Sequence, residues 1–455
     1  MSKLRDILII GGGLAGAEAA WHAAESGARV RLYEMRPVRK TPVHQTDMLA
    51  ELVCSNSLKS NLISNACGLL KEEMRMLGSV TISCGDANRV PAGEALAVDR
   101  ERFAECVTER IVSLPNVTLI REEVTEIPAD GITIIASGPL TSDSLAESIG
   151  KLTGLDYLYF YDAVAPTITA ESIDYEKAFR ASRWGKGEPA YINCPFTEQE
   201  YDAFWEALVS AETVPIAEYE KIKFFEGCMP IEELARRGKQ TPAYGPMRPV
   251  GLDDPRTGKW PFALVQLRQE NAEGTLYGLV GFQTRMKWGE QERVFRMIPG
   301  LEHAEFVRFG VMHRNTYVES PKLLLPTLQL REHPNILLSG QITGVEGYVE
   351  SAAMGILAGM NAARLVLGEE PVVLPGASMI GTLADYISSP QTENFQPMNA
   401  NFGILPKPPV RIRNKKDRQA AQVETALSAI REFVDGRYQV SGIGCQGAEE
   451  PAPNN

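Results

Sequence analysis

Apolar and polar positions near the start of the chain follow the order strand, helix, strand. The run Asp6-Ile-Leu-Ile-Ile10 is apolar after its first residue and predicts a short buried strand. Small residues from Ala17 to Ala24 predict a closely packed helix, and Arg29-Val-Arg-Leu-Tyr33 predicts a second strand. This order is typical of a βαβ unit, from which parallel sheets are built.

The same two patterns return later in the chain. Residues 98–113 have helical spacing, and the apolar runs 117–120 and 131–136 predict two more strands. Towards the C-terminus, residues 335–339 predict another strand and residues 351–367 a helix with small residues along it. These elements extend the first unit to a larger α/β domain.

Two stretches interrupt this alternation. Residues 41–60 are polar and irregular, and we expect a loop that leads into a helix. Beyond Leu155, aromatic and β-branched residues such as Tyr159 and Ile168 predict a strand of a mixed second domain. Residues 198–212 then predict a helix. The change of pattern indicates an insertion into the first domain.

A glycine-rich turn joins the first strand to the first helix. Gly11, Gly13 and Gly16 form G-x-G-x-x-G, which allows a tight turn, close approach of a pyrophosphate and close helix packing. Glu34 ends the second strand, where a carboxylate can accept hydrogen bonds from a ribose. NADP carries a 2′-phosphate, which needs basic residues close after Glu34. Arg36 is the only basic residue there, so the sequence favours FAD or NAD over NADP. The predicted cofactor residues here are Gly11, Gly12, Gly13, Leu14, Ala15, Gly16 and Glu34.

A second glycine-rich turn follows the strand at residues 335–339. We expect it to face the same cofactor, although an ordinary connection between strand and helix is the alternative. Residues 136–138 end another apolar strand in a small-residue turn, a feature common in large flavoproteins. The residues predicted to face the cofactor in the second turn are Gly340, Gln341, Gly344 and Gly347.

These patterns predict a discontinuous domain organisation. A doubly wound, Rossmann-like FAD-binding domain of the glutathione-reductase type comprises residues 1–155 and 319–435. An inserted α+β domain, residues 156–318, interrupts it and is expected to receive the substrate. Residues 436–455 are expected to form a disordered tail.

Composition narrows the functional classes. A chain of 455 residues exceeds the usual size of one core, and 44% hydrophobic residues is ordinary for a globular protein. No apolar run reaches membrane-spanning length and no signal peptide precedes the first strand, so we expect a cytoplasmic protein. The net charge of −12 gives no general attraction for nucleic acid, so an RNA partner requires a local basic patch. No spacing of ligands predicts a metal site.

Two of the seven cysteines have settings that suit a nucleophile. Cys228 lies just before a helix predicted from Pro230, and a helix N-terminus stabilises a thiolate. Cys54 precedes residues 55–57, which can cap a helix, and Lys59 is a nearby cation. The alternative for each is a small buried hydrophobic residue. The others, which lack such settings, are Cys67, Cys84, Cys106, Cys194 and Cys445.

Basic residues concentrate in two segments. Arg285 and Lys287 can hold phosphates or carboxylates, and Trp288 offers a flat face to a pterin, a flavin or a base. A solvated charged helix is the alternative. The second segment, residues 411–418, is interpreted as the start of a surface helix rather than an RNA contact.

The strings around these residues closely resemble one family. Residues 6–18, 51–58, 227–233, 288–291 and 340–348 are similar to the bacterial folate- and FAD-dependent tRNA uracil-5 methyltransferases, the TrmFO family. The resemblance extends from about residue 5 to residue 434. It implies FAD as cofactor, and tRNA, through its T-arm, as partner.

The resemblance also implies a reaction, methylation of carbon 5 of a T-loop uridine. The carbon donor would be 5,10-methylenetetrahydrofolate, reduced FAD would act as carrier and reductant, and NADPH or NADH would regenerate the flavin. Cys54 and Cys228 carry over as the catalytic thiols, one of which attacks the uracil. The oligomeric state, monomer or homodimer, is left open.

Two other functions fit part of the pattern. The related flavoprotein that modifies wobble uridines shares the glycine-rich turns but is considerably longer. A pyridine-nucleotide disulfide oxidoreductase shares the flavin fold but uses closely spaced redox cysteines, whereas Cys54 has its nearest sequence neighbour at Cys67. An RNA-binding protein with a structural flavin would not require the two thiols.

Overall fold

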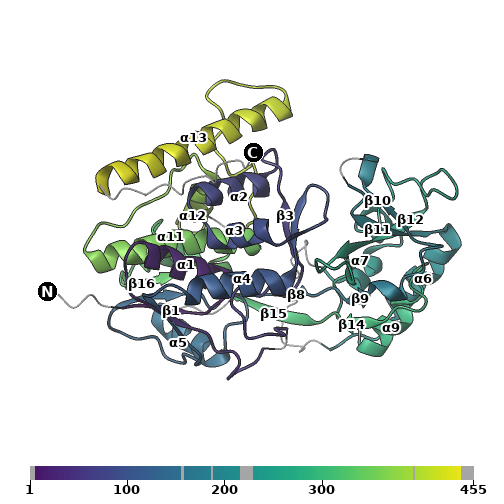
Figure 1. Cartoon of the computed structure of the whole chain (residues 1–455), viewed down its shortest axis with the longest axis horizontal. Helices are drawn as coiled ribbons and strands as arrows, with labels where there is room; N and C mark the ends of the chain where they lie inside the picture. The colour runs from purple at the N-terminus through teal and green to yellow at the C-terminus, as the bar shows by residue number, and fades with distance from the viewer. Residues whose placement is uncertain are drawn as a thin grey trace, which may run out of the picture.

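The computed structural model describes residues 6–41, 43–154, 158–185, 188–215, 229–392 and 395–441. Within these ranges the backbone alone is described for residues 158–163, 312–316 and 437–441. Two groups of helices and strands lie side by side, a larger one that contains the N-terminal elements and a smaller one built from the middle of the chain (Figure 1).

The larger group is built on a five-stranded parallel sheet in the order β16-β7-β1-β2-β6. The central strand is nearly all apolar, as expected when helices cover both of its faces. The predicted α/β fold with a parallel sheet is confirmed. The strands are β1 (Ile7–Ile10), β2 (Val30–Tyr33), β6 (Val117–Ile120), β7 (Ile132–Ile135) and β16 (Ile336–Leu338).

Two helices from opposite ends of the chain lie against each other on this sheet, α1 (Leu14–Glu25) and α11 (Tyr348–Leu367) (Figure 1). A β-carbon on Gly355 would lie 2.3 Å from the carbonyl oxygen of Ala15, so the two backbones are in direct contact. Gly355, one of the small residues of α11, therefore faces the neighbouring helix rather than the sheet. This contact joins the chain before the insertion to the chain after it.

The smaller group is an antiparallel sheet with helices packed on it, which confirms the inserted α+β domain. The strand order is β10-β11-β12-β13-β9-β14. Its strands are β9 (Thr167–Thr169), β10 (Phe179–Ala181), β11 (Tyr191–Phe196), β12 (Ala263–Gln269), β13 (Leu276–Leu279) and β14 (Phe306–Arg308). The helices are α6 (Glu198–Ser210), α7 (Ile231–Arg237), α8 (Thr241–Tyr244) and α9 (Trp288–Phe295), with short 3-10 turns at Ala170–Ser172 and Arg183–Gly185.

A two-stranded antiparallel ribbon carries the chain into the smaller group and back. It consists of β8 (Leu158–Ala163) and β15 (Met312–Tyr317), with Leu158 paired to Tyr317. Each of the two groups of elements has its own hydrophobic core. The predicted domain limits, 1–155 with 319–435 and 156–318, remain a prediction.

The interpretation of residues 41–60 as a loop that leads into a helix was wrong at its C-terminal end. Residues 57–60 form a strand of a small three-stranded sheet, β3-β5-β4, rather than a helix. The reason is tertiary, because this strand has its partner in β5, far along the chain. The sheet and its helices comprise β3 (Ser57–Ser60), α2 (Ala66–Met76), α3 (Val80–Ala87), β4 (Arg89–Val90), β5 (Ala95–Val98) and α4 (Arg100–Val112).

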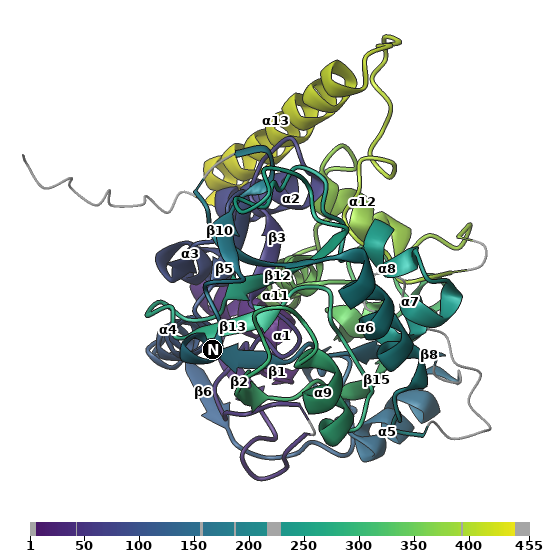
Figure 2. The ribbon, with the colours of Figure 1, turned by 90° about the vertical axis from the view of Figure 1, so that its right-hand side faces the viewer.

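The C-terminal helix lies across α2 at the edge of the molecule (Figure 2). This helix, α13 (Lys415–Ser441), extends past the predicted start of the disordered tail at residue 436, so that boundary was wrong. Residues 442–455 lie outside the described residues. The remaining elements are α5 (Asp143–Thr153), α10 (Ser320–Leu323), a 3-10 turn at Gln341–Thr343, and α12 (Met379–Tyr386).

Candidate functional site

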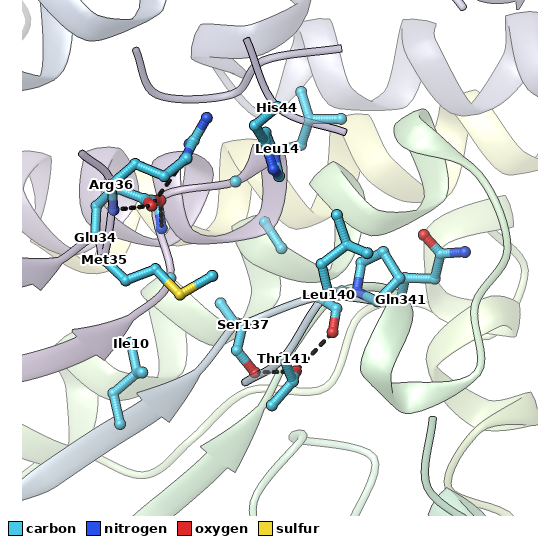
Figure 3. Close-up of a pocket in the computed structure, with 18 of the residues that line it drawn as sticks. Ile10, Leu14, Glu34, Met35, Arg36, His44, Ser137, Leu140, Thr141 and Gln341 are labelled. Atoms are coloured by element: carbon cyan, nitrogen blue, oxygen red, sulfur yellow. Dashed lines mark hydrogen bonds and ion pairs between the residues drawn. The ribbon is translucent and has the colours of Figure 1, made fainter. Parts of the chain in front are cut away.

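A deep pocket opens where the parallel strands of the main sheet end (Figure 3). It has a volume of about 1110 Å³, counting its open mouth. In open α/β sheets, ligands bind outside the carboxyl ends of the strands, so this is the expected position. The predicted residues that line it are Gly11, Gly12, Gly13, Leu14, Ala15, Glu34, Gly340, Gln341 and Cys54.

The first glycine-rich turn leaves room for a ligand at the start of α1. A β-carbon on Gly13 would meet no atom within 4 Å, and no side chain caps the helix there. The start of α1 is therefore open to an anion, as a bound pyrophosphate requires. Gly16 does not line the pocket, because a β-carbon on it would lie 1.8 Å from the carbonyl oxygen of Gly11. Its role is to let helix and strand approach.

Glu34 lies beside this turn at the end of β2. Its carboxylate accepts hydrogen bonds from the Gly12 amide at 3.0 Å and from the Arg36 amide and Nε at 3.0 and 2.9 Å. Burial alone would raise the pKa of Glu34, but the hydrogen bonds and charge of Arg36, with the Gly12 amide, lower it overall. Glu34 is therefore an ionised acceptor at the pocket wall.

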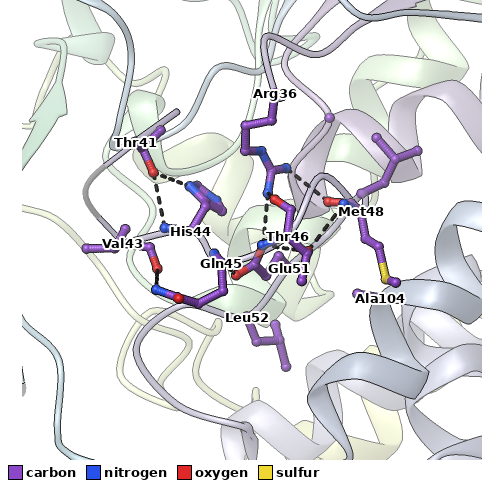
Figure 4. A network of polar contacts seen from close by, with 12 residues as sticks. Arg36, Thr41, Val43, His44, Gln45, Thr46, Met48, Glu51, Leu52 and Ala104 are labelled. Carbon is purple, nitrogen blue, oxygen red and sulfur yellow. Dashed lines mark hydrogen bonds and ion pairs between the residues drawn. The ribbon is translucent and has the colours of Figure 1, made fainter. Parts of the chain in front are cut away.

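The Arg36 guanidinium is fully engaged within the protein (Figure 4). It is buried and donates to Glu34, to Glu51 at 3.1 Å and to the carbonyl oxygens of Thr46 and Met48. A 2′-phosphate would have to compete with these partners. The engagement of Arg36 therefore favours FAD or NAD over NADP at this site, as the sequence predicts.

The second glycine-rich turn contributes to the opposite side of the pocket. Gly340 and Gln341 line it, and the Gln341 amide donates to Glu346 at 2.8 Å. Gly344 and Gly347 have φ of 84° and 119° and do not line the pocket. They shape the turn instead, because only glycine adopts these angles readily.

Cys54 lies at this pocket, but not at a helix terminus as predicted. The chain forms β3 from Ser57, so no helix begins directly after Cys54. Its partner is Tyr348, the first residue of α11, whose hydroxyl donates to Cys54 Sγ at 3.1 Å and accepts from the Cys54 amide at 2.7 Å. Burial, followed by the charge of Cys54, raises the pKa of Tyr348 well above its usual value. The hydroxyl therefore remains a donor to the sulfur.

Arg100 adds positive charge near this sulfur. The Arg100 guanidinium donates to the carbonyl oxygens of Leu52 and Val53 at 2.8 and 3.2 Å, just ahead of Cys54. Burial lowers the pKa of Arg100, but the charges of Glu270, Tyr348 and Cys54 raise it overall. Its cation, like a hydrogen-bond donor, favours a thiolate over a thiol.

The residues after Cys54 are fixed by the smaller group of elements. The Arg268 guanidinium on β12 donates to Ser55 Oγ at 2.6 Å and to Asn56 Oδ1 at 2.7 Å. The buried Asn56 amide donates in turn to the carbonyl oxygen of Gln269 at 2.8 Å. The loop that carries Cys54 is therefore held by both groups of elements.

The second predicted nucleophile, Cys228, lies outside the described residues. The helix expected after it is present as α7, with Pro230 at the N-cap rather than at the first helical position. Glu232 in its first turn is buried and accepts from Thr284 Oγ1 at 2.8 Å and the Arg285 amide at 2.9 Å. Burial raises the pKa of Glu232 despite these bonds.

The predicted substrate residues of the smaller group have unequal surroundings. Arg285 pairs with Glu233 at 2.5 Å and Lys287 with Glu212 at 2.7 Å, so both cations already have acid partners. The Trp288 side chain is 63% exposed and its ring stacks on Phe309 at 5.3 Å. Of the three, only Trp288 presents a free face, and their binding role remains a prediction.

Sequence reasoning missed the residues that surround Cys54. Tyr348 and Arg100 belong to helices α11 and α4, far from Cys54 along the chain. One signal was available, because Tyr348 directly follows a glycine-rich turn expected to face a cofactor. Ser137, in the small-residue turn noted at residues 136–138, also lines the pocket and is joined by a hydrogen bond of 2.7 Å to Thr141, which was not singled out (Figure 3).

No helix in the described ranges of the chain is long and apolar enough to cross a membrane. Within the same part of the chain, no three His, Cys, Asp or Glu side chains are grouped as metal ligands.

Comparisons with known proteins agree with this geometry. Residues 6–370 match the family described as "Glucose inhibited division protein A". A protein of Pelotomaculum thermopropionicum, "Methylenetetrahydrofolate--tRNA-(uracil-5-)-methyltransferase TrmFO", is 60% identical over 94% of this chain and 98% of its own length. The Bacillus subtilis protein of the same name is 60% identical over 93% and 97%.

Solved structures show a similar fold. Aquifex aeolicus GidA in its form I crystal has a TM-score of 0.70 at 19% identity, over 96% of this chain and 78% of that one. The form II crystal gives 0.69 at 18% identity, over 96% and 75%. At these identities the likeness supports the fold alone.

Proposed function

Because this chain belongs to the TrmFO family of methylenetetrahydrofolate-dependent tRNA (uracil-5-)-methyltransferases, we propose that it methylates carbon 5 of a T-loop uridine in tRNA. The carbon donor is 5,10-methylenetetrahydrofolate and the cofactor is FAD. The observation that carries the proposal is the position of Cys54. It lines the same pocket as both glycine-rich turns, so a thiol and a flavin can act on one base.

The pocket fits FAD through three features. The open start of α1 at Gly13 receives the pyrophosphate, the Glu34 carboxylate accepts from the adenosine ribose, and Gln341 borders the space left for the flavin ring. Bound FAD, reduced by NAD(P)H, supplies the one-carbon unit taken from the folate and the electron pair that completes the methyl group.

The thiol makes carbon 5 of uracil reactive. A thiolate adds to carbon 6, and the electrons of the double bond between carbons 5 and 6 move to the oxygen on carbon 4. The resulting enolate bonds to the one-carbon unit at carbon 5. Loss of the proton on carbon 5 and breakage of the bond between the one-carbon unit and its carrier would leave a methylene group on carbon 5. Uptake of the hydride supplied by the reduced cofactor would convert this group to methyl, and the enolate so formed would expel the thiolate from carbon 6.

We propose that Tyr348 and Arg100 keep Cys54 ready for this chemistry. The Tyr348 hydroxyl donates to the sulfur, and the Arg100 cation favours its charged form. Cys228 supplies the second thiol that the family uses. Which of the two adds to uracil and which assists is decided by trapping the covalent adduct with a 5-fluorouridine tRNA and mapping the modified cysteine.

The proposal is tested by the reaction itself. Purified protein is incubated with undermodified tRNA, NADPH and methylenetetrahydrofolate, and nucleosides are analysed by mass spectrometry. We expect 5-methyluridine only in the complete mixture, with NADH and NADPH compared as reductants. No product in the complete mixture, or equal product when S-adenosylmethionine replaces the folate, contradicts the proposal.

We also propose that the protein works in the cytoplasm. The described cysteines are all free, which suits a reducing compartment that contains tRNA and reduced folates. A fusion to a fluorescent protein, followed by cell fractionation, tests this directly.

A further inference from the structure

A run of cations without described protein partners precedes α13 and continues into its first turn. All of them except Arg418 are exposed, and none has an ion pair or a side-chain hydrogen bond to another described residue. Asp417 is the only acid among them. We call this set the basic segment; it comprises Lys407, Arg411, Arg413, Lys415, Lys416 and Arg418.

Several exposed cations elsewhere in the described part of the chain have carboxylate partners. Arg29 pairs with Asp6 at 3.0 Å, Lys151 with Glu147 at 2.7 Å and Lys177 with Glu302 at 2.6 Å. In a chain with a net charge of −12, a cluster of cations without such partners is a local exception. Its positive field is therefore available to an external anion.

The basic segment borders a broad groove at the edge of the larger group. The other wall of the groove is the start of α2, at Ser64, Asn65 and Ala66. The segment extends away from the body of the molecule at the top of the view in Figure 2. The starts of α2 and α13 both border this groove, and helix N-termini favour anions.

The groove is linked to the pocket that contains Cys54 through the first turn of α11. Ala400, at one end of the groove, donates its amide to Glu350 at 3.0 Å, and Glu350 lies in the first turn of α11 beside Tyr348. Ser64, at the other wall, is ten residues from Cys54. An extended chain covers at most about 35 Å over that separation. One folded tRNA can therefore occupy both places.

We propose that the basic segment binds the phosphate backbone of the tRNA outside the T-loop, although the sequence alone favoured the start of a surface helix over an RNA contact for residues 411–418. This rests on the proposed function, and it adds a docking surface to it. Phosphates along RNA present a row of single charges that matches a row of unpaired cations. Such contacts are independent of base sequence and position the substrate, while the pocket selects the base.

The test replaces three cations together, Arg411→Gln, Arg413→Gln and Lys415→Gln, and measures tRNA affinity at several salt concentrations. The salt slope is the change in the logarithm of the binding constant with the logarithm of the salt concentration. Each lost phosphate contact makes this slope shallower by about 0.7–0.9, so the triple variant should have a slope shallower by roughly 2–3. At about 0.15 M salt the same term raises Kd on the order of 10²-fold. The KM for tRNA in methylation should rise in parallel, while bound flavin is retained.

A matched triple variant controls for the change of net charge. It carries Arg29→Gln, Lys151→Gln and Lys177→Gln, which remove three exposed but paired cations. We expect wild-type affinity and salt slope from it. The proposal is overturned if both triple variants lose tRNA affinity equally, or if the variant of the basic segment keeps its affinity for tRNA. Anionic vesicles that compete with tRNA for the wild type but not for the first triple would assign the segment to a membrane instead.

These outcomes remain separate from failure of the proposed function. If the wild type forms no 5-methyluridine at all, the proposed reaction fails. If it does so and the first triple has an unchanged KM for tRNA, only the docking surface fails.

Discussion

Removing the Tyr348 hydroxyl should raise the pH at which Cys54 reacts. In Tyr348→Phe the sulfur loses a donor at 3.1 Å, and the amides of Cys54 and Ser55 lose the acceptor at 2.7 and 3.3 Å. A hydrogen bond to a charged group contributes about 1.5–3 kcal/mol. At about 1.36 kcal/mol per pH unit, the reactive form of Cys54 should appear roughly 1–2 pH units higher.

The assay is the rate of iodoacetamide labelling at Cys54, followed by mass spectrometry across a pH series. The shift is towards higher pH because the Cys54 thiolate loses a hydrogen-bond donor and becomes less stable. Methyl transfer should fall near neutral pH and recover partly in alkaline buffer. Tyr386→Phe is the matched control, since it removes a tyrosine hydroxyl that donates to the Gln396 carbonyl at 2.7 Å. An unchanged midpoint in Tyr348→Phe would refute this account of the thiol.

Three further predictions concern the pocket and its thiols. Gly13→Ala should fold normally but lose flavin absorbance, because the added β-carbon enters open pocket space. Gly16→Ala should instead lower the melting temperature, because its β-carbon would lie 1.8 Å from the carbonyl oxygen of Gly11. The ionised Glu34 carboxylate stabilises the fold above its ordinary pKa of 4.5, and this contribution is lost as the pH falls through the lowered folded pKa. In urea unfolding, the deficit of Glu34→Gln should therefore be largest near pH 7 and shrink in acid; a constant deficit would contradict this. Cys54→Ala and Cys228→Ala should each abolish methyl transfer with flavin retained, and full turnover by either would return that cysteine to a structural role.

Local sequence patterns predicted the elements that hold the cofactor. The strand before Gly11, the helix after Gly16 and the turn from Gly340 to Gly347 depend on short-range periodicity and on glycine conformations, which neighbouring residues determine. For this reason the parallel sheet and the position of the pocket followed from the sequence alone.

The surroundings of Cys54 could not be predicted in the same way. The sequence suggested a helix after Cys54, but the chain forms a strand because β5 offers it a partner. The donor to its sulfur, Tyr348, is 294 residues away in the chain. Contacts of this kind arise from tertiary packing, which periodicity and capping rules do not contain.

The central claim is that this pocket transfers carbon from a folate to uracil. The most direct measurement is the mass of the nucleosides of an undermodified tRNA after reaction with methylenetetrahydrofolate labelled with ¹³C in its methylene group. The account predicts 5-methyluridine heavier by one mass unit at the T-loop uridine. Unlabelled product, label at another nucleoside, or no product from the flavin-loaded protein would contradict it.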